Sequence, residues 1–186
     1  EPAERFQGRE GRLKILVVGG SLGADVLNKT VPQALALLPD DARPQMYHQS
    51  GRGKLGSLQA DYDALGVKAE CVEFITDMVS AYRDADLVIC RAGALTIAEL
   101  TAAGLGALLV PYPYAVDDHQ TANARFIVQA EAGLLLPQSQ LTAEKLAEIL
   151  GGLNREKCLK WAENARTLAL PHSADDVAEA AIACTA

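Results

Sequence analysis

The stretch LVICRAGALTIAE, residues 87–99, decides the fold of this chain. An apolar run of strand length leads into a turn of small residues that carries Arg91, and a helical pattern begins directly after it. A helix start without bulky side chains exposes backbone N–H groups and the positive end of the helix dipole. With Arg91 beside it, this turn is suited to hold an anion such as phosphate.

The same alternation of short apolar runs and helical patterns continues through the chain, which is typical of an α/β protein with a parallel sheet. The expected strands are residues 13–18, 44–49, 69–74, 87–90, 107–110 and 133–136. The expected helices are residues 24–38 with a kink at Pro32, 54–65, a short helix capped by Thr76 or Asp77 that ends near 84, 94–103, 117 or 118 to about 131, 143–150, 156–168 and 175–184. The sequence predicts a doubly wound, Rossmann-like six-stranded parallel sheet with extra C-terminal helices.

Composition narrows the class of protein. With 186 residues, of which 49% are hydrophobic, the chain can bury the core of one globular domain. A net charge of −7 argues against a nucleic-acid binder, which needs clustered Lys and Arg. The sequence has no apolar run near the ~20 residues of a membrane span and no visible signal peptide, so we expect a cytoplasmic protein. Residues 1–12 are polar and charged without periodicity, and we interpret them as an interdomain linker that precedes a domain of residues 13–186.

Neither a metal site nor a disulfide is indicated. The cysteines, which form no C-x-x-C pair and are expected to be free buried thiols, are Cys71, Cys90, Cys158 and Cys184. The three histidines are too scattered for a zinc motif. Asp61-Tyr62-Asp63 resembles the D-x-D metal motif of some glycosyltransferases, but it lies in a polar helical stretch, where a solvated helix face is the simpler interpretation. We expect no metal and no cofactor.

Two glycine-bearing loops are expected to face each other. If the strand order is 3-2-1-4-5-6, the sheet reverses between the first and fourth strands, and ligands bind at that point. The loop after the first strand is GGSLG, residues 19–23, which matches neither G-x-G-x-x-G nor a Walker loop. A tight turn that merely needs glycine stays an alternative for this loop, with Ser21 as a helix cap, a phosphate donor or both.

Other polar residues near this edge also have two interpretations. For Arg91 the alternative to anion binding is a surface ion pair with Asp84 or Asp86. Glu99 has apolar or small neighbours, so we expect a carboxylate on the buried side of its helix that reaches sugar hydroxyls, with a solvated helix face as the alternative.

The segment after the fifth strand, PYPYAVDDHQTAN, residues 111–123, leaves the sheet at the same edge. His119, Gln120 and Asn123 suit the recognition of hydroxyl and amide groups on a sugar. Ordinary helix capping by Asp117 or Asp118 is the alternative for this segment.

Four ordered motifs resemble the carboxyl-terminal, donor-binding half of the MurG family of peptidoglycan glycosyltransferases. They are GGSLGA at 19–24, HQSG at 48–51, EFI-x-DM at 73–78 and CRAGALT-x-x-E at 90–99. The resemblance implies one half of a GT-B type, inverting, metal-independent hexosyltransferase. That family transfers N-acetylglucosamine from its UDP form onto the lipid I acceptor to make lipid II. It also implies an N-terminal acceptor domain as partner and a peripheral position on the cytoplasmic face of the bacterial inner membrane.

Carried over to this sequence, the resemblance implies a role for each site residue. Ser21 and the phosphate loop of Gly19, Gly20 and Gly23 contact the diphosphate, and Ile75 lies against uracil. Arg91 and the backbone at Gly93, Ala94, Leu95 and Thr96 form part of the nucleotide pocket, and Glu99 binds the ribose hydroxyls. His119 and Gln120 touch the sugar, with Asn123 nearby. Leu22 and His119 stand where relatives often carry glutamine.

By the same resemblance, the general base for the acceptor hydroxyl belongs to the other half of the enzyme. We therefore expect this chain to contain no catalytic residue, to bind UDP-N-acetylglucosamine and to transfer nothing alone. The alternatives are a soluble donor subunit of a split dolichol-type N-acetylglucosamine transferase, a UDP-N-acetylglucosamine 2-epimerase half, and a noncatalytic nucleotide- or dinucleotide-binding module. The polar residues 1–12 and the lack of an initiating methionine argue against the first, and the 91–99 run argues against the second.

Overall fold

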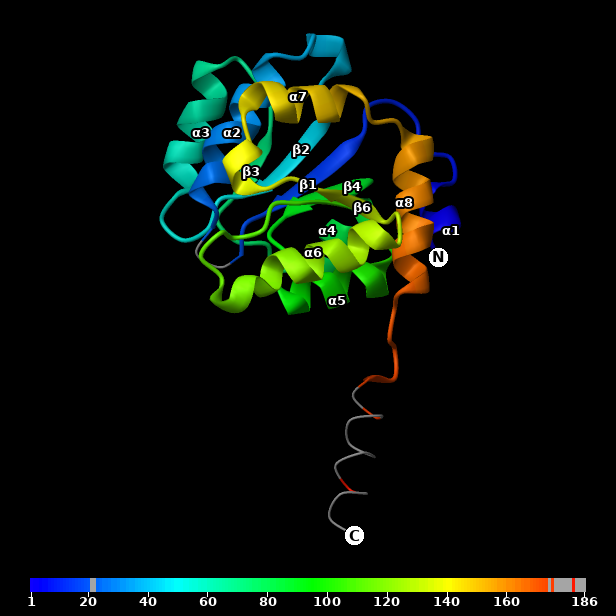
Figure 1. Ribbon diagram of the computed structural model, residues 1–186. Helices are drawn as coiled ribbons and strands as arrows, with labels where there is room; N and C mark the ends of the chain where they lie inside the picture. The colour runs from blue at the N-terminus through cyan, green and yellow to red at the C-terminus, as the bar shows by residue number, and fades with distance from the viewer. Residues whose placement is uncertain (21–22, 174, 176–181, 183–186) are drawn as a thin grey trace.

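The computed structural model describes residues 1–20, 23–173, 175 and 182 (Figure 1). Six strands form one parallel sheet in the order β3-β2-β1-β4-β5-β6. The strands are β1 Lys14–Val18, β2 Gln45–Gln49, β3 Glu70–Val72, β4 Leu87–Cys90, β5 Ala107–Leu109 and β6 Gly133–Leu135. This confirms the predicted doubly wound α/β class and the strand order. The reversal falls between β1 and β4, which are directly paired.

Helices cover both faces of the sheet. They are α1 Pro2–Phe6, α2 Asp25–Ala36, α3 Leu55–Ala64, α4 Met78–Asp84, α5 Ala94–Ala103, α6 His119–Gln129, α7 Ala143–Gly151 and α8 Arg155–Thr167. Short 3-10 turns lie at Asp40–Ala42, Val116–Asp118 and Gln138–Gln140. Figure 1 shows α2, α3 and α7 on one side of the sheet and α4, α5 and α6 on the other.

The strand residues alternate between two hydrophobic clusters. In β1, Ile15 and Val17 pack into the cluster with α2, α3 and α7, whereas Leu16 packs into the cluster with α4, α5 and α6. Successive side chains of a strand point to opposite faces, so a continuous apolar run is what a sheet covered on both faces requires. The loops that follow the strands lie at the edge of the sheet where the carboxyl ends of the parallel strands meet.

Most expected helix signals are seen in the structure. Asp77 caps α4 by accepting a hydrogen bond from the Ser80 N–H at 3.0 Å, and this bond lowers the pKa of its carboxyl. Thr142 caps α7 in the same way. Helix α2 runs through Pro32 as a single helix. The helix expected over 175–184 falls on residues that, apart from 175 and 182, lie outside the described part of the chain.

Residues 1–12 pack against the domain, whereas the sequence predicted an interdomain linker without periodic structure. Residues 2–6 form α1, which packs on α8, and Phe6 is buried. Arg5 donates hydrogen bonds to the carbonyls of Ala103 and Gly104 at the end of α5. The missing periodicity has a physical cause, because this segment is held by arginine side chains rather than by an apolar stripe. That the segment also leads from another domain stays a prediction.

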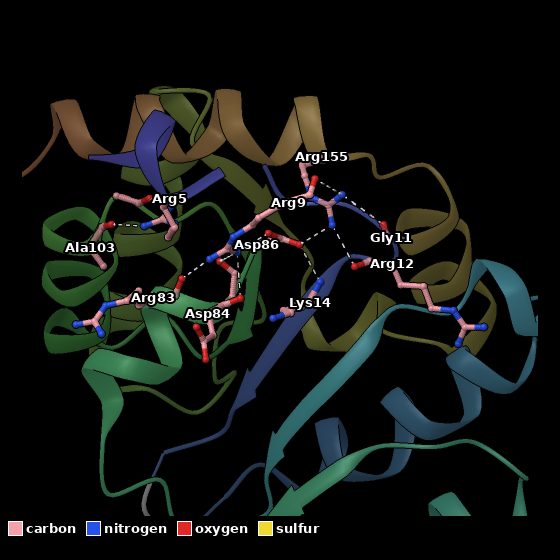
Figure 2. A network of polar contacts seen from close by, with 12 residues as sticks. Arg5, Arg9, Gly11, Arg12, Lys14, Arg83, Asp84, Asp86, Ala103 and Arg155 are labelled. Atoms are coloured by element: carbon pink, nitrogen blue, oxygen red, sulfur yellow. Dashed lines mark hydrogen bonds and ion pairs between the residues drawn. The ribbon is translucent and has the colours of Figure 1, made fainter. Parts of the chain in front are cut away.

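A buried carboxylate completes this attachment (Figure 2). Asp86 is fully buried and accepts hydrogen bonds from Arg9 at 2.6 Å, from Arg155 at 3.3 Å and from the Lys14 N–H at 2.9 Å. Arg9 also donates to main-chain carbonyls at the end of α4, and Arg155 donates to the carbonyls of residues 9, 11 and 12. The network therefore ties residues 9–12, β1, β4 and α8 together.

Three of the four cysteines can be placed, and all three are free thiols as expected. Cys90 and Cys158 are buried, which raises the pKa of each thiol to about 12. Cys71 is only half-buried, and its pKa is raised to about 11. Cys184 lies outside the described residues.

Candidate functional site

A cavity of about 520 Å³ opens at the carboxyl ends of β1 and β4, where the strand order reverses. Its volume falls in the range of about 300–1,000 Å³ that small-molecule sites occupy. The predicted site residues that line it are Gly19, Gly20, Gly23, Arg91, Gly93, Thr96 and Gln120. The two glycine-bearing loops thus face each other, as their place at the reversal of the sheet predicted.

The loop after β1 needs glycine for two different reasons. A Cβ at Gly19 would overlap the backbone nitrogen of Ala24, and a Cβ at Gly23, which has φ +70°, would overlap the Ser50 carbonyl. At Gly20 an added Cβ would meet nothing within 4 Å. Packing therefore requires glycine at Gly19 and Gly23. Gly20 borders the open side, and its φ of +85° lies in the left-handed region that favours glycine. Ser21 lies outside the described residues, and the N-cap position of α2 belongs to Ala24.

Two helix N-termini border the cavity. Helix α2 begins at Asp25 and helix α5 at Ala94, and the first N–H groups of a helix have no partner within it. Both dipoles therefore direct positive charge towards this space. The Asp25 carboxylate opposes this field, but it is paired with Lys54 at 2.7 Å. The backbone here is suited to an anionic group.

Arg91 is half-buried at the edge of the cavity and braces the loop that follows β5. It donates to the carbonyls of Val110 and Pro111 at 3.0 and 3.1 Å and to Oε1 of Gln138 at 2.7 Å. Its guanidinium lies 5.4 Å from the centre of the Tyr112 ring. Arg91 has no ion pair within 4.0 Å among the residues that the structure describes. Its charge is thus left without a carboxylate partner.

The alternative of an ion pair between Arg91 and the acidic residues before β4 is wrong. Asp86 is engaged with Arg9 and Arg155 instead. Those partners lie at the amino-terminal end of β4, whereas Arg91 follows its carboxyl end.

Gln120 and Asn123 hold the turn after β4 in place. Oε1 of Gln120 accepts from the N–H groups of Tyr112 at 2.9 Å and Ala92 at 3.3 Å, and Nδ2 of Asn123 donates to the Ala92 carbonyl at 3.0 Å. Nε2 of Gln120 and Oδ1 of Asn123 make no hydrogen bond to any described residue. One donor and one acceptor are therefore left for a ligand. His119 is exposed at the start of α6.

The structure places Ile75 and Glu99 outside this cavity. Ile75 lines a second cavity of about 580 Å³ between α4 and strands β1 to β3. Glu99 lines a third cavity of about 480 Å³ between α1, α4 and α5. The predicted residues thus spread along one sheet edge and the start of α5 instead of sharing one hollow. Ala94 and Leu95 are exposed on the first turn of α5.

The expectation that Glu99 lies on the buried side of its helix is wrong. Glu99 is exposed, because α5 turns Ile97, Leu100 and Thr101 towards the sheet. Its Oε2 accepts a hydrogen bond from the Tyr82 hydroxyl at 2.8 Å. Burial and this bond raise the pKa of Tyr82. Oε1 of the carboxylate makes no hydrogen bond within the described residues, so it can accept one from a ligand.

Sequence reasoning missed the role of Gln49. Its Nε2 donates to the Gly20 carbonyl at 3.2 Å, and its Oε1 accepts from the Ile75 N–H at 3.0 Å. One side chain therefore joins the loop after β1 to the turn after β3. The signal was present, because Gln49 stands in the HQSG motif at the end of a predicted strand, but the sequence does not show which backbone groups its side chain contacts.

His48 beside it is a buried structural residue. Its Nδ1 lies 2.9 Å from the Tyr62 hydroxyl, and its Nε2 lies 3.2 Å from Oδ1 of Asn28. Burial lowers the pKa of His48 to about 3, so the ring is neutral near pH 7. Asn28 in turn donates to the Ser50 carbonyl at 2.9 Å, the atom that Gly23 packs against. The network supports the floor of the glycine loop.

The D-x-D stretch has the structure that a solvated helix face predicts. Asp61 and Asp63 are exposed on α3, and Tyr62 between them is buried in the core. Asp63 accepts a hydrogen bond from Gln59 at 3.1 Å. Among the described residues, no group of three or more His, Cys, Asp or Glu side chains could hold a metal ion.

Within the same residues, no helix has the length and apolar character to cross a bilayer.

Comparison with known proteins identifies close relatives. The profile described as glycosyltransferase family 28 C-terminal domain matches residues 14–179. The chain is 97% identical over 185 residues to the UDP-N-acetylglucosamine–N-acetylmuramyl-(pentapeptide) pyrophosphoryl-undecaprenol N-acetylglucosamine transferase of Neisseria meningitidis serogroup B, covering 100% of this chain and 52% of the relative. It is 56% identical over 179 residues to the protein of that name from Bordetella pertussis, covering 96% and 50%. The chain thus spans about half the length of the curated relatives it matches.

Solved structures agree with this result. The crystal structure of Acinetobacter baumannii MurG matches with a TM-score of 0.88 at 40% identity, covering 96% of this chain and 52% of that one. The calicheamicin glycosyltransferase CalG4 matches with a TM-score of 0.63 at 19% identity, covering 96% and 46%, which shows a shared fold alone.

Proposed function

Because this chain belongs to the glycosyltransferase family 28 C-terminal domain family, we propose that it binds UDP-N-acetylglucosamine as the donor half of an enzyme that converts lipid I into lipid II. The names of relatives that are 97% and 56% identical support this donor and this acceptor. The rest of the enzyme, in this proposal, is an N-terminal domain that holds the lipid-linked acceptor at the cytoplasmic face of the inner membrane.

The observation that carries the proposal is the cavity between the N-termini of α2 and α5. The donor's diphosphate lies there, held by the N–H groups of the glycine loop and of residues 94–96 and by the charge of Arg91. Ser21 is assigned to the same diphosphate. Two helix dipoles and an arginine without a carboxylate partner among the described residues meet at this point, which suits an anionic group.

The remaining parts of the donor extend from this point along the sheet edge. Uracil lies towards the backbone of Ile75, and the ribose hydroxyls reach the free oxygen of Glu99. The N-acetylglucosamine ring lies towards α6, where Nε2 of Gln120 and Oδ1 of Asn123 are open and His119 is exposed. Leu95, which is 81% exposed, contributes its backbone rather than its side chain.

Transfer to a hydroxyl places negative charge on the leaving UDP. The N–H groups at the two helix starts and Arg91 stabilise this charge as it develops. The acceptor hydroxyl must also lose a proton to a general base, which this proposal assigns to the other half of the enzyme. The chain alone therefore binds donor and transfers nothing.

Isothermal titration calorimetry of the purified chain with UDP-N-acetylglucosamine, UDP-glucose and UDP-N-acetylgalactosamine tests the proposal. In the calorimetric titrations, UDP-N-acetylglucosamine should bind more tightly than the other two sugar nucleotides. In a separate thermal-unfolding titration, NAD should leave the melting temperature of the chain unchanged, because only a ligand that binds the native state stabilises that state. Stabilisation by NAD without any by UDP-N-acetylglucosamine would indicate a dinucleotide-binding module. Transfer of sugar to a lipid I analogue by this chain alone would contradict the assignment of the base.

A further inference from the structure

Gln49 lies at a point of the sheet from which one side chain can reach two loops. It is the last residue of β2, and β2 lies between β1 and β3 in the sheet. Gln49 is paired with Val18 on one side and Val72 on the other, the last residues of those two strands. The chain leaves β1 into the glycine loop and leaves β3 towards Ile75, so a side chain at this point lies between both segments.

The two hydrogen bonds of Gln49 have opposite polarity. On one side the amide NH2 donates to the Gly20 carbonyl at 3.2 Å, and on the other side the amide oxygen accepts from the Ile75 N–H at 3.0 Å. A primary amide carries a donor and an acceptor at fixed spacing, whereas a carboxylate only accepts and a thioether is a weak acceptor that cannot donate. Glutamine is thus the residue type that satisfies both backbone groups at this reach.

The backbone around Gln49 is itself held on both sides. The Ser50 N–H donates to the Val72 carbonyl at 2.9 Å, and the Gly51 N–H donates to the Glu73 carbonyl at 3.1 Å. The Ser50 carbonyl accepts from Asn28 at 2.9 Å. With a side chain only 6% exposed, Gln49 has little freedom to change its two partners.

We propose that Gln49 is a positioning residue that couples the glycine loop at Gly20 to the turn at Ile75, so that the diphosphate and the base of a uridine nucleotide are held at one spacing. The inference rests on the proposed function, which assigns the diphosphate to the first segment and the base to the second. It adds that the two subsites respond to each other through a residue that touches neither group.

Binding of UDP to Gln49→Met, measured by calorimetry, is the first test. The side chain keeps its length and loses both strong hydrogen bonds, and the affinity should fall about tenfold or more, the effect of losing roughly 1.4 kcal/mol. Gln49→Glu is the second variant. One carboxylate oxygen can still accept from the Ile75 N–H, but the other faces the Gly20 carbonyl and cannot donate to it. This variant should also bind UDP more weakly than wild type does. Gln129→Met, at the exposed end of α6 and outside the three cavities, is the matched control and should bind UDP as wild type does.

A second readout separates coupling from a general loss of structure. In the 15N-labelled wild-type chain, pyrophosphate alone should shift the amide resonance of Ile75 as well as that of Gly20. In Gln49→Met the Ile75 response should disappear, while the Gly20 response persists. The wild-type titration alone is decisive if the variants do not fold.

The outcomes separate this inference from the function it rests on. If wild type binds UDP but Gln49→Met binds it equally well, or if pyrophosphate leaves Ile75 unmoved in wild type, the coupling role is wrong and the donor site stands. If wild type does not bind UDP at all, the proposed function fails and the inference fails with it.

Discussion

Replacing Asp86 by asparagine tests whether residues 1–12 belong to the folded domain (Figure 2). The Asp86 side chain is fully buried and serves Arg9, Arg155 and the Lys14 N–H. Asparagine has the same shape, but it carries no charge and one of its two ends is a donor. That end would face an N–H group instead of accepting from it.

The size of the effect follows from burial. Removing one partner of a buried ion pair costs about 3–5 kcal/mol when the remaining charge is uncompensated. Here the side chains of Arg9 and Arg155 are 18% and 23% exposed, and both also donate to main-chain carbonyls. Solvent and backbone therefore offset part of the cost of leaving their charges without Asp86. We expect Asp86→Asn to lower the free energy of unfolding by about 2–4 kcal/mol. For a chain of this length, that lowers the melting temperature by roughly 5–15 °C.

Urea unfolding followed by circular dichroism measures the loss, and amide hydrogen exchange shows whether residues 2–9 open early. The matched control is Asp84→Asn, two residues away with an exposed side chain, which should change stability by less than about 0.5 kcal/mol. Equal stability of Asp86→Asn and wild type would show that the buried carboxylate does not hold this network together. Exchange of residues 2–9 at unfolded rates in wild type would show that these residues do not belong to the folded domain.

Three further predictions concern the glycine loop, the buried histidine and the anion site. Gly23→Ala should destabilise the chain by more than about 2 kcal/mol, because left-handed strain of about 1–2 kcal/mol adds to the overlap with Ser50. Gly53→Ala, with φ +71° and open space, should cost only the strain, and equal losses in urea unfolding would contradict this account. The pKa of His48 is about 3 in the folded chain, below its ordinary 6.5. The unfolded chain therefore binds the extra proton between these values, and His48 should lower stability by about 1.4 kcal/mol per pH unit as pH falls through this window. In His48→Gln this contribution to the pH dependence of the unfolding free energy should vanish. An unchanged pH dependence of unfolding in the variant would contradict a buried, neutral His48. Arg91→Ala should weaken UDP about tenfold or more, since a charge-assisted contact contributes roughly 1.5–3 kcal/mol. Glu99→Ala should weaken UDP less, because the hydrogen bonds of its carboxylate to the ribose are partly offset by its repulsion of the diphosphate. Arg125→Ala and Glu163→Ala, at exposed positions on α6 and α8, should leave calorimetric affinities unchanged, and a parallel loss in these controls would refute the site assignment.

The fold was predictable where local pattern and tertiary role agree. Strand β4 and helix α5 have the bounds that the sequence predicted, because a wholly apolar run ends at a turn of small residues there. The buried face of α5 was not predictable in the same way. Small and apolar residues surround Glu99 on every side of that helix, so the sequence pattern does not show which face packs on the sheet.

Features that depend on partners distant in sequence were also missed. The packing of residues 1–12 against the domain was not predicted, because their anchors, Asp86 and Arg155, lie far along the chain. The predicted strand order already placed β2 between β1 and β3, but the bridging role of Gln49 depends on two side-chain hydrogen bonds to loops that the order does not specify. For Arg91, Gln120 and Asn123 the sequence indicated a polar site, but it could not show that each also braces the loops around it.

A crystal structure of this chain with bound UDP shows whether the cavity at the carboxyl ends of β1 and β4 holds the diphosphate. The diphosphate oxygens should lie within hydrogen-bond distance of N–H groups in the glycine loop after β1 and at residues 94–96, with Arg91 beside them. A diphosphate bound in the cavity at Ile75, in the cavity at Glu99, or away from the carboxyl ends of β1 and β4 would contradict this placement.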